Sequence, residues 1–329
     1  MPRSFDPPVR PASGAPAEVI RSSASASRHH PVSDRASLPL NLLISLRPRQ
    51  WTKNLLVFAG LIFGQKLLER AALERATAAF AIFCVLSGVI YLINDLRDRE
   101  ADRLHPDKAR RPIASGALAP SAAAISAIVL GSAGLLAAFA LDPKFGLVAL
   151  AYVALLGLYS AGLKHMVILD VLTIAVGFVF RALAGALVID VPFSHWLLLL
   201  TLLGAMFLAL SKRRAELVSL SDDATGHRRI LAEYSPYLLD QMVGVVTAST
   251  LLAYAFYTIS PETVTKFGTD HLLYTVPFLL YGIFRYLYLV HRREGGANPS
   301  ELLVTDRPLL ACVALWVVVV VLIVYGPLR

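Results

Sequence analysis

Nine long apolar runs divide this 329-residue sequence, and they restrict the fold more than any other feature. Several reach the roughly 20 residues that a helix needs to cross a bilayer. The 56% of apolar residues and the mean hydropathy of +0.62 exceed the values of ordinary soluble domains. The sequence predicts an all-α, polytopic transmembrane helical bundle with about nine spans, at residues 54–68, 72–93, 120–141, 145–160, 167–189, 195–210, 237–259, 272–290 and 308–326.

The first 37 residues differ in character from the rest of the chain. They are rich in proline, serine, alanine and arginine without apolar periodicity, so we expect residues 1–37 to form a disordered cytoplasmic tail. No apolar segment follows the early arginines as it would in a signal peptide. Residues 38–329 are expected to form one transmembrane domain, without a separate soluble domain.

The distribution of lysine and arginine predicts the orientation in the membrane. These residues concentrate in the loops after the second, fourth, sixth and eighth runs, whereas the opposite loops and the C-terminus offer little besides Lys144, Lys266 and Arg329. Lys66, Arg70 and Arg75, which follow the first run, weakly oppose this distribution of positive charge. Because positive loops stay inside, we expect an inner (plasma) membrane protein with a cytoplasmic N-terminus. The net charge of +8 then reflects topology and anionic substrates, not nucleic acid.

An acidic motif follows the second apolar run, where membrane meets water. Asn94, Asp95, Asp98 and Asp102 fall at positions i, i+1, i+4 and i+8, within roughly a 100° arc of a helix. Crowded oxygen donors repel one another unless a cation joins them, and Mg²⁺ is typically held by a few carboxylates plus substrate phosphates. We therefore expect these four residues to bind Mg²⁺ on the cytoplasmic side.

A basic run comes directly after the acidic motif. Lys108, Arg110 and Arg111 supply the cations that a diphosphate group requires. A solvated helix end with mixed charges is the ordinary alternative. The membrane context favours a diphosphate site instead.

Polar residues at two further membrane boundaries extend the candidate site. Segment 47–54 leads into the first run, and its Lys53 and Asn54 are candidates to bind phosphate. The alternative is that this segment only anchors the chain at the membrane interface. Tyr159 and Lys164 follow the fourth run, where snorkelling of the lysine is the plain alternative.

Two ionisable residues lie within the fifth apolar run. Asp170 and Arg181 are eleven residues apart, so on a helix they point within about 20° of the same direction. Charges inside a span are costly and usually face a polar interior. The pair predicts a polar cavity reaching into the bundle, with solvation of Asp170 at the interface as the alternative.

The sixth apolar run ends in cations, Lys212, Arg213 and Arg214, with Glu216 close behind. A stop-transfer signal accounts for such a run, and Lys212 with Glu216 would form an ordinary i,i+4 pair. The position of this loop, on the same side of the membrane as the acidic motif, favours a part in substrate binding.

These motifs together resemble the UbiA-type intramembrane prenyltransferase superfamily, over roughly residues 40–327. Asn94-Asp-x-x-Asp-x-x-x-Asp102 is similar to its first aspartate-rich motif. Five further segments are similar to the decaprenyl-phosphate phosphoribosyltransferases within the superfamily, at 47–54, 105–116, 163–165, 181–185 and 212–216. The resemblance implies the helical fold of this superfamily and Mg²⁺ as cofactor.

The second polar loop departs from the superfamily pattern. Ordinary members carry a second aspartate-rich motif there, which helps to hold a prenyl diphosphate through Mg²⁺, whereas this chain has Lys212, Arg213 and Arg214. The resemblance thus implies transfer of 5-phosphoribosyl from phosphoribosyl diphosphate to a polyprenyl phosphate of decaprenyl type, with diphosphate released. This reaction would make lipid-linked pentose donors for cell-envelope polysaccharide, such as arabinan precursors.

The resemblance also implies roles for individual residues, and it is compatible with a homo-oligomer. Action on the diphosphate leaving group is expected of Asp95, Asp98, Asp102, Lys108 and Arg111. Binding of phosphate, ribose or a cation is expected of Lys53, Asn54, Tyr159, Lys164, Asp170, Arg181, Lys212, Arg213 and Glu216.

Two rival activities stay open at this point. A prenyltransferase that attaches a polyprenyl chain to an aromatic acceptor, such as 4-hydroxybenzoate, would keep the fold and the first motif, but the basic second loop argues against it. An anion transporter would explain the spans and Arg181. It would not explain four metal-type oxygen donors at an interface, because transporter sites typically lie near the midplane.

Overall fold

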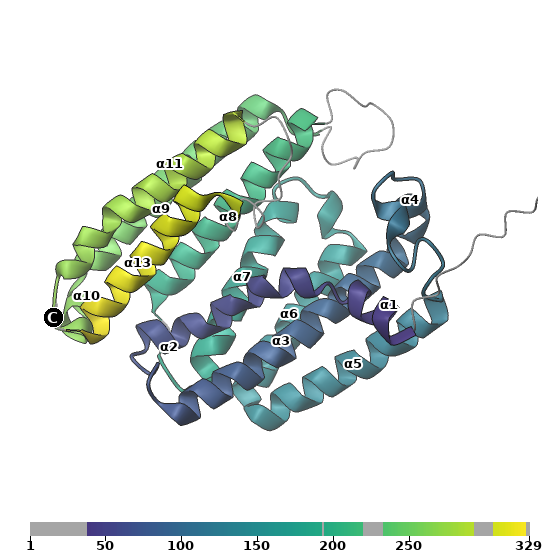
Figure 1. Ribbon diagram of the computed structural model, residues 1–329, viewed down its shortest axis with the longest axis horizontal. Coiled ribbons are helices and arrows are strands. Elements are labelled where there is room, and N and C mark those ends of the chain that lie inside the picture. The colour runs from purple at the N-terminus through teal and green to yellow at the C-terminus, as the bar shows by residue number, and fades with distance from the viewer. Residues whose placement is uncertain (1–37, 193, 220–232, 293–304, 327–329) are drawn as a thin grey trace, which may run out of the picture. The chain divides into compact units, whose positions relative to one another are not determined.

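The computed structural model describes residues 38–192, 194–219, 233–292 and 305–326, and every regular element in these ranges is a helix (Figure 1). The predicted tail, residues 1–37, lies outside them. Among the described residues, eight helices are long and apolar enough to cross a membrane, which agrees with the predicted polytopic bundle. They are α3 (Arg70–Arg97), α5 (Pro120–Leu141), α6 (Pro143–Ala161), α7 (Leu169–Val188), α8 (His195–Ser219), α9 (Pro236–Ile259), α11 (Val276–Arg292) together with the preceding 3₁₀ turn from His271, and α13 (Arg307–Tyr325).

The first apolar run, residues 54–68, does not form one straight helix. A 3₁₀ helix, η1 (Pro48–Phe58), leads into the short helix α2 (Ala59–Phe63). Runs of 3₁₀ helix as long as η1 are uncommon, and such stretches often mark functional segments. The other short helices are α1 (Leu38–Ser45), α4 (Arg99–Arg103), η2 (Lys108–Arg110), η3 (Leu163–His165), α10 (Pro261–Phe267) and η5 (His271–Thr275).

Four helices begin at a short polar residue that is followed closely by proline. The side chains of Asp142, Ser235, Ser260 and Asp306 each accept a hydrogen bond from the backbone N–H three residues on. The bond satisfies a donor that every helix start leaves unpaired, and proline in the first turn needs no such partner. These local signals therefore determine where α6, α9, α10 and α13 begin.

Helix α7 lies between α6 and α8 and packs against η1 (Figure 1). Phe83, Phe145 and Tyr152 fill the space between α3, α6 and α7 and are buried. On the other side, α8, α9 and α11 pack around Phe207 and Tyr286. The polar residues of α7 are thereby held inside the protein.

Gly185 allows α7 to approach η1 closely. A Cβ added at Gly185 would lie 1.9 Å from the carbonyl oxygen of Val57, so the backbone of η1 would have to move. The same contact brings Gly60 against α7, where an added Cβ would lie 3.1 Å from the Cα of Ala186. Glycine is required here by space, since any side chain would separate the two elements.

We expect Gly185→Ala to lower the free energy of unfolding by about 1–3 kcal/mol, the usual cost of overpacking. Thermal unfolding of the detergent-solubilised protein measures the effect. Gly157→Ala in α6 is the matched control, because a Cβ added there meets no atom within 4 Å. Alanine also favours a helix over glycine. Equal melting temperatures for the two variants would contradict the close contact.

Candidate active site

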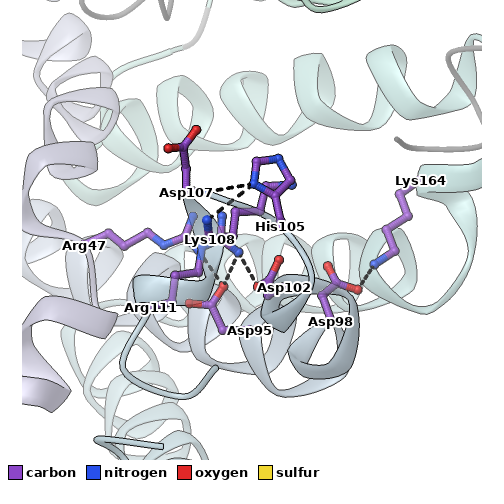
Figure 2. A network of polar contacts seen from close by, with 9 residues as sticks. All are labelled: Arg47, Asp95, Asp98, Asp102, His105, Asp107, Lys108, Arg111 and Lys164. Atoms are coloured by element: carbon purple, nitrogen blue, oxygen red, sulfur yellow. Dashed lines mark hydrogen bonds and ion pairs between the residues drawn. The ribbon is translucent and has the colours of Figure 1, made fainter. Parts of the chain in front are cut away.

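The acidic motif lies where α3 ends and α4 begins (Figure 2). The helix is interrupted at Asp98, whose φ of −91° and ψ of 5° leave the helical region. The four oxygen donors that were expected on one helix are therefore divided between α3, the break at Asp98 and α4. Asp95 and Asp102 are buried, whereas Asp98 and Asn94 are partly exposed.

Arg111 joins the two buried aspartates of the motif. Its Nη1 lies 3.1 Å from Asp95 Oδ1 and 2.6 Å from Asp102 Oδ2. Arg47 Nη2 lies 2.5 Å from the same oxygen of Asp95, and its guanidinium is 4.7 Å from the centre of the Tyr91 ring. Two cations from different segments thus neutralise the carboxylates that the sequence assigns to a metal.

Asp98 forms a separate contact, away from the other two aspartates (Figure 2). Lys164, from η3, donates a hydrogen bond of 2.6 Å to Asp98 Oδ1. The turn before η2 is held by His105, whose Nδ1 accepts from the backbone N–H groups of Asp107 at 3.2 Å and Lys108 at 3.4 Å. Lys164 therefore contacts the acidic motif, and Lys108 lies beside it (Figure 2).

No preformed metal cluster exists among the described residues, where no three carboxylate, imidazole or thiol groups lie close enough to hold an ion. Basic side chains instead stand next to Asp95, Asp98 and Asp102. The chemistry of the donors still suits Mg²⁺, because hard carboxylate oxygens from two residues converge on one cationic nitrogen of Arg111. A metal would have to displace guanidinium or ammonium groups from these oxygens.

Asp170 is completely buried at the start of α7. Arg213 Nε donates to Asp170 Oδ2 at 2.8 Å, and the Tyr234 hydroxyl donates to Oδ1 at 2.8 Å. Arg213 Nη1 also donates to Glu216 at 2.7 Å. The alternative of a solvated Asp170 is therefore wrong. The guanidinium of Arg213, expected to bind a phosphate, is engaged by two carboxylates.

Tyr234 is a site residue that the sequence does not reveal, since it lies outside the apolar runs and the polar motifs. Its hydroxyl oxygen accepts a hydrogen bond of 2.7 Å from the backbone N–H of Ile168. Ile168 has a φ of 68°, a conformation that is strained for a β-branched residue. Tyr234 therefore helps to hold the turn that delivers Asp170. Tyr159, which the sequence suggests, is half-buried on α6 and forms no hydrogen bond with the described residues.

Arg181 is buried in the middle of α7, as its spacing from Asp170 predicts. Its Nε donates to Asn54 Oδ1 at 2.7 Å, its Nη1 to the Gly177 carbonyl at 2.9 Å, and its Nη2 to the Tyr152 hydroxyl at 2.8 Å. All three nitrogens of the guanidinium thus donate hydrogen bonds to protein groups. Arg181 thus ties η1 and α6 to α7, and Tyr152 is a second partner that the sequence does not reveal.

Lys53 is half-buried on η1 and has no hydrogen-bond or ion-pair partner within the described ranges. Burial lowers the pKa of Lys53 to about 7, and the charges of Lys212, Arg181 and Arg47 act in the same direction. Lys212 is 48% exposed and lies 3.8 Å from Glu216. Cations from η1, α7 and α8 therefore repel one another here, and a bound anion would relieve that repulsion.

A largely apolar cavity of about 750 Å³ lies among η1, α2, α7, α8, α9, α10, α11 and α13. Leu56 and Ala59 line it from η1 and α2, and Thr201 lines it from α8. An adjoining apolar cavity of about 330 Å³ shares Gly204 and Leu279 with the first. Concave apolar surfaces of this size accommodate hydrocarbon chains.

The fold and the site define a class of protein: a multi-pass membrane protein with a charged site at the ends of its helices and an apolar chamber among them. The sequence profile described as the UbiA prenyltransferase family matches residues 55–305, and the chain belongs to this family.

Similar proteins agree with this assignment over most of their length. The decaprenyl-phosphate phosphoribosyltransferase of Mycobacterium tuberculosis is 31% identical, with 87% of this chain and 94% of that protein covered. The protein of the same name from Corynebacterium glutamicum is 33% identical, with 86% of each chain covered. A UbiA homologue from Archaeoglobus fulgidus, solved with GPP and Mg²⁺, has the same fold, with a TM-score of 0.64 at 20% identity over 87% of this chain and 98% of that one.

The buried pair of Asp170 and Arg213 gives a stability prediction. Asp170→Ala removes one partner of a buried ion pair, so we expect it to cost about 3–5 kcal/mol of unfolding free energy. Tyr234→Phe should cost about 1–3 kcal/mol, because the backbone N–H of Ile168 loses its acceptor. Chemical or thermal unfolding in detergent measures both.

Asp240→Ala is the matched control for these variants. Asp240 also pairs with an arginine of α8, Arg214, but it is 41% exposed. Exposed pairs contribute at most about 1 kcal/mol. The account of the buried pair fails if Asp170→Ala and Asp240→Ala destabilise the protein equally.

Proposed function

We propose that this protein transfers the 5-phosphoribosyl group of phosphoribosyl diphosphate to a polyprenyl phosphate of decaprenyl type and releases diphosphate. The observation that carries the proposal is the likeness to named decaprenyl-phosphate phosphoribosyltransferases over 87% of the chain. The site supports it, since α8 carries Lys212, Arg213 and Arg214 where an aspartate-rich motif would serve a prenyl diphosphate. The active site is proposed to face the cytoplasm of a bacterial inner membrane, on the basis of the loop charges.

The proposed chemistry needs little help from a base. An oxygen of the lipid phosphate is already anionic, and it forms a bond to C1 of the ribose while the bond from C1 to the diphosphate oxygen breaks. The electron pair of that bond leaves with the diphosphate. Stabilisation of this leaving group is the main task of the protein.

The acidic motif and its cations are the proposed place of the leaving group. Arg111 and Lys164 already reach the motif, at 2.6 Å from Asp102 and Asp98 respectively, and are positioned to donate to diphosphate oxygens. Mg²⁺ held by Asn94 and the three aspartates would neutralise further negative charge on diphosphate. The apolar cavity is proposed to hold part of the polyprenyl chain.

A donor-labelling experiment tests the proposed function. Purified protein receives radiolabelled phosphoribosyl diphosphate with decaprenyl phosphate, or radiolabelled prenyl diphosphate with 4-hydroxybenzoate. We expect organic-soluble label only in the first reaction, together with one equivalent of diphosphate released. Prenylated aromatic product without a phosphoribosylated lipid would overturn the proposal and establish the aromatic-acceptor activity in its place.

Metal dependence gives a second prediction. Excess chelator should abolish turnover and added Mg²⁺ should restore it. Asp98→Asn should lower the rate by at least about a thousandfold, which corresponds to about 4 kcal/mol of barrier, while the partly exposed side chain leaves folding intact. Steady-state rates measure the loss of turnover. The melting temperature of each variant shows separately whether it folds.

Glu100→Gln is the control for the acidic motif. Glu100 lies on α4 between Asp98 and Asp102, but it is 67% exposed and pairs with Arg99 and Arg103 only at the surface. The Glu100→Gln variant should therefore keep the wild-type rate. Full activity of Asp98→Asn, or of the wild type in chelator, would exclude the metal assignment.

A further inference from the structure

Lys53 stands on the face of η1 that continues into the apolar cavity. Side chains three residues apart eclipse each other in a 3₁₀ helix, and three residues rise by about 6 Å. Lys53 therefore lies directly in line with Leu56, and Ala59 follows at the start of α2. Leu56 and Ala59 both line the cavity. The ammonium group thus stands one turn beyond the apolar lining.

Lys212 lies on α8 beyond the residues that line the cavities, as Lys53 does on η1. It follows Thr201 by eleven residues and Leu208 by four, so it points within about 20° and about 40° of these side chains. Thr201 lines the larger cavity and Leu208 the adjoining one. Lys212 and Lys53 therefore cap two walls of the same apolar space, and their charges are close enough to act on each other.

The other cations of the site are engaged by protein groups. Arg47, Arg111 and Lys164 bind the aspartates of the acidic motif at 2.5 to 3.1 Å. Arg213 binds two carboxylates within the protein. Lys53 differs from all of them in having no such partner within the described ranges.

We infer that Lys53 and Lys212 bind the phosphate of the lipid acceptor at the end of the apolar cavity, separately from the acidic motif that receives the donor diphosphate. The inference rests on the proposed function and assigns its two anionic substrates to different cations. Only the lipid combines a phosphate with a hydrocarbon chain, so it alone matches cations placed at the end of an apolar space. Phosphoribosyl diphosphate has no apolar part to bury there.

The assignment predicts which Michaelis constant each variant changes. With the full chain in lipid nanodiscs, Lys53→Gln and Lys212→Gln should each raise the KM for decaprenyl phosphate by on the order of tenfold, the usual effect of losing a charged hydrogen bond. The KM for phosphoribosyl diphosphate should change less than about twofold. Arg111→Gln should show the opposite pattern, because Arg111 belongs to the acidic motif. Lys144→Gln, at an exposed position on α6, is the neutral control.

Direct binding separates this inference from the proposed function. Decaprenyl phosphate and decaprenol are each titrated against the protein without any donor. Wild type should bind the phosphate more tightly than the alcohol by at least about tenfold, and the Lys53→Gln, Lys212→Gln double variant should lose this preference. Folding of each variant is checked by its melting temperature.

Each outcome of the two experiments has a distinct meaning. A raised KM for phosphoribosyl diphosphate with an unchanged KM for the lipid would assign Lys53 and Lys212 to the donor and overturn the inference. An unchanged preference for decaprenyl phosphate over decaprenol in the double variant would also overturn it. Absence of phosphoribosyl transfer by wild type would reject the proposed function, and the binding measurement would still decide whether the two lysines hold a lipid phosphate.

Discussion

Charges buried among membrane helices must find partners, and the arrangement of the helices around the site depends on this constraint. A buried ion without a partner costs several kcal/mol. The ion pair of Asp170 and Arg213, at 2.8 Å, joins α7 to α8. Arg181 joins α7 to η1 through Asn54 and to α6 through Tyr152. The helices that carry the site are therefore fixed to one another by polar contacts as well as by apolar packing.

The buried aspartates of the acidic motif also have cationic partners, but these arginines are more exposed and can be displaced more easily. Arg47 and Arg111 are each 28% exposed, unlike Arg213, which is 3% exposed. A diphosphate that draws these guanidinium groups toward itself would leave Asp95 and Asp102 with unpaired charge. A metal ion arriving with the diphosphate would take up that charge. Binding of donor and of metal would thus be coupled, because each would compensate for the contacts that the other breaks.

Hydropathy alone was sufficient to predict most of the fold, because crossing a bilayer demands long apolar runs. The predicted run 120–141 coincides with α5 (Pro120–Leu141). The form of the first run differs from the prediction, since hydropathy does not distinguish a 3₁₀ helix from an α-helix. Helical spacing placed Asp170 and Arg181 in the interior correctly.

Partners that are distant in sequence could not be predicted in this way. Tyr234 reaches Asp170 across 64 residues, and Arg181 reaches Asn54 across 127. No local pattern encodes such pairs, since each depends on how separate helices pack. The three consecutive cations of α8, Lys212, Arg213 and Arg214, show the same limit. Successive helical residues point about 100° apart, so one run of charge serves several directions. Arg213 turns inward to Asp170, Arg214 pairs with Asp240 of α9, and Lys212 stays half-exposed in line with the cavity wall. Of the three cations, only Lys212 is therefore placed for the proposed contact with a lipid phosphate, and Arg213 and Arg214 pair with carboxylates of the protein.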